Sequence, residues 1–167
     1  TEIWKPIIEE IEKLSKKNYK GNEKPMRIIA DHIKASVFII ADGITPSNLE
    51  QGYVLRRLIR RAIRYGKRLG ISPDADLTTP LVKIIIKIYS GTYSHLKKNK
   101  EKIINELNLE ENKFEKTLDK GLKEFKKMSL NKQISNKEAF LLFQSYGFPI
   151  EMTKELAKEK SIKVDEK

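Results

Sequence analysis

Arginine is concentrated in one short stretch of this lysine-rich chain. Of the 34 basic residues, 27 are Lys and seven are Arg, and six of the seven arginines lie between Arg56 and Arg68. The guanidinium group is planar, permanently charged and able to donate paired hydrogen bonds, so it fits phosphate oxygens better than an ammonium group does. The clustering therefore indicates a site that binds phosphate groups.

The spacing of these residues places their charges on one face of a helix. At about 100° per residue, the basic residues between Tyr53 and Leu69 fall within an arc of about 140°. They are Arg56, Arg57, Arg60, Arg61, Arg64, Lys67 and Arg68. The opposite face is aliphatic, and we expect it to be buried. It includes Leu55, Leu58, Ile59 and Ala62.

The basic face contains no acidic residue. A solvated helix face normally mixes charges of both signs, because acid–base pairs four residues apart stabilise the helix. We therefore predict that Arg56, Arg60 and Arg64 are exposed without acidic partners and contact a nucleic-acid backbone, which positions a ligand without reading its sequence. A basic surface with no ligand is one alternative. A helix lying on a membrane surface is another, although the apolar face lacks the Trp or Phe typical of such helices.

The composition excludes several other chemistries. The net charge is +11, but this value alone decides little because the chain is generally rich in Lys. The absence of cysteine excludes disulfides, thiolate zinc sites and cysteine nucleophiles. His32 and His95 lack metal-type spacing, so we expect no metal site. No apolar run approaches the roughly 20 residues of a membrane span, and the first residues do not resemble a secretory signal. We expect a soluble, cytoplasmic protein without membrane contact.

Other polar and aromatic residues have weaker cases. Asp31 and His32 resemble a catalytic pair, but no nucleophile accompanies them, so a structural histidine is favoured. Tyr53 and Tyr65 could stack on bases, yet packing at the edge of the helix is the preferred interpretation. His95 is expected at the surface.

Apolar residues recur at helical spacing along nearly the whole chain, which predicts an all-α bundle of about six or seven helices. The first four expected helices span 2–17, about 25–40, 52–69 and 80–96. The remaining three span 100–128, Ser135 to about Tyr146, and Pro149 to about Lys160. The first should bury Ile3, Trp4, Ile7, Ile8, Ile11 and Leu14. The second, apolar on most sides, should be central. A strand is the alternative for the β-branched run 81–88, and Gly121 is a weak point in 100–128. Ser135 and Glu138 fit a capping box.

Three blocks of this sequence resemble alanyl-tRNA synthetases. They are RIIADHIKA at 27–35, IIADGITPSN at 39–48 and GYVLRRLIRRAIRYG at 52–66. The resemblance continues in order through Glu110, Glu111, Phe114, Thr117, Leu118, Gly121 and Gly147-Phe148-Pro149. It covers essentially the whole chain, which starts at Thr and which we interpret as a piece of a larger protein.

The resemblance implies a class II ligase that joins alanine to its tRNA with ATP and Mg²⁺. Residues 1–167 would form one helical domain, or two lobes at 1–97 and 98–167, that binds the tRNA(Ala) acceptor stem and contacts its own catalytic domain through the N-terminal helices. The catalytic domain would precede Thr1, and an editing domain with zinc would follow Lys167. No catalytic residue, metal or cofactor is expected in this segment.

The resemblance also implies two residues that read a G·U wobble pair in the acceptor stem. One is Asn48, because a wobble guanine leaves its amino group unpaired in the wide minor groove of A-form RNA, where an amide carbonyl can accept from it. A turn cap is the alternative role for Asn48. The second position is usually Asp, but this chain has Gln144, which keeps an acceptor oxygen and loses the charge.

Two functions therefore stay open. The first is the tRNA-binding segment of an alanine-tRNA ligase. The second is a stand-alone helical RNA-binding or assembly factor derived from that family. A purely structural bundle would leave the arginine face unexplained.

Overall fold

The computed structural model describes residues 2–165, and within them it is almost entirely helical. Its α-helices are α1 (Lys5–Ser15), α2 (Glu23–Ala41), α3 (Glu50–Leu69), α4 (Thr78–Tyr89), α5 (Ser94–Lys98), α6 (Lys100–Met128), α7 (Asn136–Tyr146) and α8 (Ile150–Glu159). The all-α prediction is confirmed. The described part also holds two short parallel strands that the sequence analysis missed, β1 (Gln133–Ile134) and β2 (Lys163–Val164).

The chain forms two compact units, Thr1–Asn112 and Lys113–Lys167. The division falls within α6, whereas the two-lobe alternative to a single domain divides the chain before that helix, at 97/98. The first turns of α6 therefore belong to the first unit and its remaining turns to the second.

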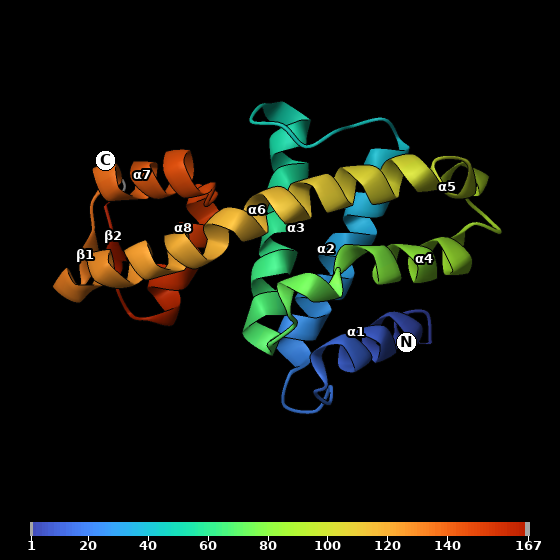
Figure 1. Cartoon of the computed structure of the whole chain (residues 1–167), viewed down its shortest axis with the longest axis horizontal. Helices are drawn as coiled ribbons and strands as arrows, with labels where there is room; N and C mark the ends of the chain where they lie inside the picture. The colour runs from blue at the N-terminus through green and yellow to red at the C-terminus, as the bar shows by residue number, and fades with distance from the viewer. Residues whose placement is uncertain (1, 166–167) are drawn as a thin grey trace. The chain divides into compact units, whose positions relative to one another are not determined.

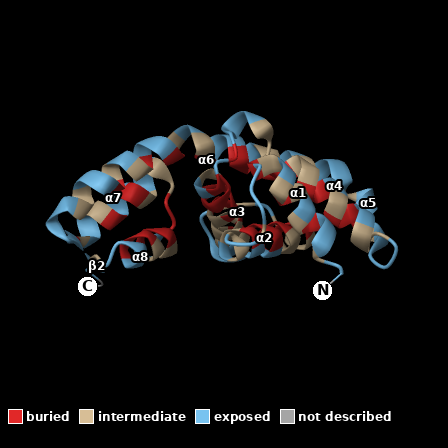
Figure 2. Cartoon of the chain, turned by 90° about the horizontal axis from the view of Figure 1, so that it is seen from below, coloured by how far each residue is buried: buried red, intermediate tan, exposed pale blue. Residues whose placement is uncertain are grey.

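Helix α2 is the centre of the first unit, as predicted. It packs against α3, α1, α4 and α5 (Figure 1). Ile29, Ile33, Val37 and Ile40 are fully buried along it. Each such side chain stabilises the fold by about 1.5–3 kcal/mol relative to an exposed one. Figure 2 shows the buried positions of α2 and α3 in red.

The first helix is shorter than predicted. It begins at Lys5 with Pro6 in its first turn, where proline is tolerated because that N–H has no helical partner. Ile3 therefore lies outside the helix and is 52% exposed, so its predicted burial was wrong. Trp4, Ile8 and Leu14 are partly exposed rather than buried, and Ile7 and Ile11 form the buried contact.

The predicted helix 80–96 is two helices, α4 and α5. The break follows Tyr89, where Ser90 and Gly91 interrupt the helix and Gly costs about 1 kcal/mol in a helix interior. Phe38 of α2 packs edge-on against Tyr89 at 5.5 Å and Tyr93 at 5.2 Å between ring centroids. These contacts hold the turn against the central helix. The alternative of a strand at 81–88 is excluded.

The second unit is built on α6, α7 and α8. The capping box at Ser135 and Glu138 is confirmed and begins α7. Helix α7 ends at Gly147 with φ 68°, where the amide N–H of Phe148 donates to the Leu142 carbonyl at 3.0 Å. The fully buried Phe148 ring then lies against Phe114 at 5.9 Å between centroids.

Candidate nucleic-acid interface

Helix α3 carries the predicted interface and is anchored through its aliphatic face. Leu55, Ile59 and Ala62 are fully buried, as predicted, whereas Leu58 is partly exposed. The helix ends at Gly70, whose φ of 84° is the left-handed conformation that glycine adopts readily.

The loop before α3 holds Asn48 at the surface. Ser47 Oγ accepts from the Leu49 amide at 3.2 Å, and the Ser47 amide donates to the Gly52 carbonyl at 3.1 Å. A Cβ on Gly52 would lie 2.1 Å from Ser47 Oγ and 2.7 Å from the Thr45 carbonyl oxygen. Glycine is therefore required for this loop to close onto the helix.

Arg56 joins this loop to the interior of the first unit. Its Nη1 donates to Asn48 Oδ1, and its Nη2 donates to the Pro46 carbonyl at 3.4 Å. Its Nε lies 3.2 Å from Glu110 Oε1. The same carboxylate oxygen accepts from Arg60 Nε at 2.6 Å.

The prediction that Arg56, Arg60 and Arg64 are exposed without acidic partners was wrong. Arg60 and Arg64 are only 8% and 4% exposed, and Glu110, itself 3% exposed, pairs with Arg56 and Arg60. Burial lowers the pKa of the Arg60 guanidinium, and the Glu110 carboxylate counteracts this effect. The acid lies on α6, fifty residues after Arg60, so the composition of α3 alone could not show it.

Tyr65 is surrounded by arginines rather than placed for stacking on a base. Its side chain is fully buried. The guanidinium carbons of Arg61, Arg64 and Arg68 lie 5.6, 4.5 and 5.8 Å from its ring centroid. Cation–π contacts of this kind attract guanidinium groups to the ring face. Tyr65 therefore organises the C-terminal half of the basic face.

The surface part of the basic face is smaller than predicted. Arg57, Arg61 and Lys67 are partly exposed, and Arg68 is exposed. These four side chains and the exposed Asn48 can meet a polyanion directly, whereas the partly exposed Arg56 is directed toward Asn48 and Glu110.

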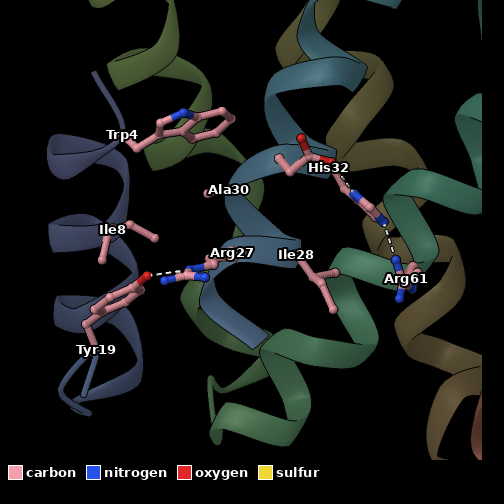
Figure 3. Close-up of a pocket in the computed structure, with 9 residues that line it drawn as sticks. Trp4, Ile8, Tyr19, Arg27, Ile28, Ala30, His32 and Arg61 are labelled. Carbon is pink, nitrogen blue, oxygen red and sulfur yellow. Dashed lines mark hydrogen bonds and ion pairs between the residues drawn. The ribbon is translucent and has the colours of Figure 1, made fainter. Parts of the chain in front are cut away.

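A pocket of about 620 Å³ lies between α1, α2 and Arg61 of α3 (Figure 3). Its lining is partly aromatic and partly charged, with Trp4, Ile8, Tyr19, Arg27, Asp31, His32 and Arg61. Arg27 Nε donates to Tyr19 Oη at 2.5 Å.

His32 is a structural residue of this pocket, as predicted. Arg61 Nη1 lies 2.9 Å from His32 Nε2, and Asp31 Oδ2 lies 3.0 Å from His32 Nδ1. Because a guanidinium only donates, Nε2 must accept and Nδ1 must carry the proton that Asp31 accepts. The ring is thereby held as the neutral tautomer.

Gln144 lies on the exposed surface of α7 in the second unit. The surrounding motif has a structural explanation. A Cβ on Gly121 would lie 2.4 Å from the Phe148 ring, so only glycine admits the ring against α6. Thr117 Oγ1 donates to the Tyr146 carbonyl at 2.8 Å. These contacts fix the C-terminal end of the helix that carries Gln144.

Glu110 and Glu111 are buried acids whose partners were not predicted from the sequence. A clue was available, because both lie between Leu107 and Phe114 in the apolar stripe of α6. An acid in such a stripe indicates a buried partner. Glu111 Oε1 accepts from the Leu77 amide at 2.8 Å, and its Oε2 accepts from Thr78 Oγ1 at 2.5 Å.

Within residues 2–165, no group of three or more His, Asp or Glu side chains is arranged to hold a metal ion. None of the helices in this described part is long and apolar enough to cross a membrane.

The first unit thus combines an arginine-bearing helix, a glycine-dependent loop at its start and a buried acid that pairs with two of the arginines. A family profile described as "tRNA synthetases class II (A)" matches residues 1–167. The chain belongs to this family of class II tRNA synthetases.

Individual relatives give the same result. The chain is 48% identical over 175 residues to an alanine-tRNA ligase of Borrelia hermsii and 40% identical over 169 residues to one of Thermotoga maritima. Each match covers 99% of this chain but only 29% and 19%, respectively, of the relative. The chain therefore spans less than a third of these ligases, and the resemblance to alanyl-tRNA synthetases is confirmed.

Proposed function

We propose that this chain is the acceptor-stem recognition segment of an alanine-tRNA ligase, and that the whole enzyme attaches alanine to tRNA(Ala) with ATP and Mg²⁺. The observation that supports this proposal most directly is the exposed Asn48, which Arg56 holds in the loop at the start of the basic helix. The ligation chemistry and the editing zinc belong to other parts of the protein. Such an enzyme would act in the cytoplasm.

The base-reading role of Asn48 follows from its chemistry. The amide oxygen has two acceptor lone pairs, and Arg56 takes one of them. The second can accept from the free amino group of a wobble guanine in the minor groove. A G·C pair leaves only one hydrogen of this amino group unpaired, because the other is bonded to cytosine, so we expect its contact with Asn48 to be weaker.

Contacts to the RNA backbone are assigned to basic residues of α3 according to the exposure of their side chains. We propose that Arg57, Arg61, Lys67 and Arg68 neutralise phosphates of the stem, since all four are at least partly exposed. Arg60 and Arg64 are buried and support α3 from inside instead. Arg56 is directed toward Asn48 and Glu110 rather than outward.

We also propose that α1 and α2 face the catalytic domain. The pocket between these helices combines apolar lining from Trp4 and Ile8 with the Arg27 side chain. Such a mixed surface is typical of contacts between domains of one chain.

The full-length protein tests the function. With ATP, Mg²⁺ and alanine, it should charge a tRNA whose acceptor stem carries G·U and charge the matched G·C tRNA poorly. RNA binding without any alanylation would support the second candidate, a stand-alone RNA-binding factor.

Gln144 gives a sharper prediction for the same assay. If Gln144 occupies the second reading position, the variant Gln144→Asp should raise the G·U to G·C ratio of kcat/KM, because a carboxylate is a stronger acceptor than a neutral amide. Gln133→Asp, an exposed substitution in β1 of the same unit, is the matched control and should leave the ratio unchanged. An unchanged ratio for Gln144→Asp would remove this residue from the reading site.

A further inference from the structure

Arg56 connects three parts of the first unit through one guanidinium group. Its two terminal nitrogens contact the loop before α3, at Asn48 Oδ1 and the Pro46 carbonyl. Its Nε contacts Glu110 on α6 at 3.2 Å. A rigid planar group that bridges a surface loop and a buried acid fixes the position of the loop.

The contact also fixes which way the Asn48 amide faces. A guanidinium has donors and no acceptor, so the amide must turn its oxygen, and not its nitrogen, toward Arg56. Asn48 is exposed, and the side chain of Arg56 is the partner that orients it. Without this contact the exposed amide would be free to rotate and would present its oxygen to a base only part of the time.

Glu110, the acidic partner of Arg56, is buried and also pairs with a second arginine. Glu110 is 3% exposed, and its Oε1 also accepts from Arg60 Nε at 2.6 Å. The side chain of Arg56 is 15% exposed. Most of the Arg56 side chain is therefore unavailable to a phosphate, although Arg56, like its neighbour Arg57, is partly exposed.

We propose that Arg56 is a positioning residue for G·U recognition, which holds the Asn48 carbonyl toward the RNA minor groove while Glu110 holds Arg56. It determines base specificity without touching the base. This inference rests on the proposed reading role of Asn48.

The experiment is a double-mutant cycle in the full-length enzyme, measured as kcat/KM for alanylation of G·U and G·C stems. Arg56→Lys keeps the positive charge beside Glu110 but loses the planar fork. It should lower the G·U to G·C ratio by about fivefold to tenfold, the effect of one lost hydrogen bond. Adding Arg56→Lys to Asn48→Ala should lower the ratio no further, because the carbonyl to be positioned is gone. Arg57→Lys is the matched control and should leave the ratio unchanged.

Two results would overturn the inference while leaving the proposed function intact. One is an equal loss on both stems for Arg56→Lys, which is the signature of a backbone contact. The other is a further fall in the ratio when Arg56→Lys is added to Asn48→Ala. If Asn48→Ala alone does not change the ratio, the reading role itself fails and the inference fails with it.

A second variant covers the case in which Arg56→Lys folds poorly. Glu110→Gln leaves Arg56 in place and removes the charge that pairs with it, so the ratio should fall by a smaller factor, about twofold to threefold. An unchanged ratio in a Glu110→Gln enzyme whose thermal unfolding shows it to be folded would contradict the positioning role.

Discussion

Glu110 and Glu111 are neighbouring acids in the apolar stripe of α6, but they contact different helices. Glu110 pairs with Arg56 and Arg60 of α3, and Glu111 bonds to the start of α4. The N-cap residue Leu77 offers no side-chain acceptor to helix α4. Asp76 Oδ1 accepts from the Thr79 amide, and Glu111 supplies the acceptors for the Leu77 and Thr78 amides. One turn of α6 thus contacts both the basic helix α3 and the start of α4.

Stability should depend on the protonation of Glu111. Burial raises the pKa of this carboxyl above its ordinary value of 4.5, although hydrogen bonds from Thr78 and Leu77 oppose the rise. The folded state therefore binds a proton that the unfolded chain releases, and this contribution to stability is complete below pH 4.5. It is lost as the pH rises through the raised pKa of the folded state.

Glu111→Gln tests this dependence by urea unfolding over a series of pH values. Gln has one acceptor oxygen and places an NH₂ group near backbone donors, so the variant should be less stable by about 1–3 kcal/mol at low pH. The gap between wild type and variant should narrow as the pH rises from 4.5 through the raised pKa. A gap that widens over this range would contradict the proposed direction of the shift.

At the scale of elements, the sequence predicted most of the helices and missed what depends on contacts between them. The helical spacing of apolar residues predicted the bounds of α2, α3 and α6 to within about two residues, because each helix has a continuous apolar stripe. It failed at Ile3, where Pro6 begins the helix later, and at Gly91, where two helices had been merged. The burial of Arg60 and Arg64 could not be predicted, because it depends on tertiary packing that a local stretch of sequence does not contain.

Gly121 illustrates such a contact between elements. Replacing a helical glycine by alanine normally stabilises a helix by up to about 1 kcal/mol. Here the added Cβ would lie 2.4 Å from the Phe148 ring and 2.9 Å from Tyr146 Cβ. Gly121→Ala should therefore destabilise the second unit by about 1–3 kcal/mol through overpacking.

The measurement is urea unfolding followed by far-ultraviolet circular dichroism, with Lys120→Ala as the control at the exposed neighbouring position. A Gly121→Ala variant as stable as the control would show that Phe148 can move away from α6 at little cost.

At the scale of the whole molecule, the net charge of +11 affects association with polyanions and does not determine the fold. Each phosphate neutralised by a basic side chain releases counterions, so affinity for RNA falls with salt in proportion to the number of contacts. Replacing Arg57 and Arg68 together by Gln should flatten the slope of log affinity against log salt for an acceptor-stem RNA by about 2.

The matched control replaces two exposed lysines away from α3, Lys123 and Lys126 of α6. That control should leave the slope nearly unchanged. If both double variants change the slope equally, binding is governed by net charge and not by the basic face of α3.

The central claim is that Asn48 accepts a hydrogen bond from the free amino group of a wobble guanine. Its most direct test is the kcat/KM of the full-length enzyme for G·U and G·C acceptor stems, compared between wild type and Asn48→Ala. Loss of this contact should cost about 1–3 kcal/mol, or about 5- to 150-fold, on the G·U stem and clearly less on the G·C stem, where one amino hydrogen is bonded to cytosine. Equal losses on both stems would show that Asn48 only shapes the loop before α3, and would contradict the claim.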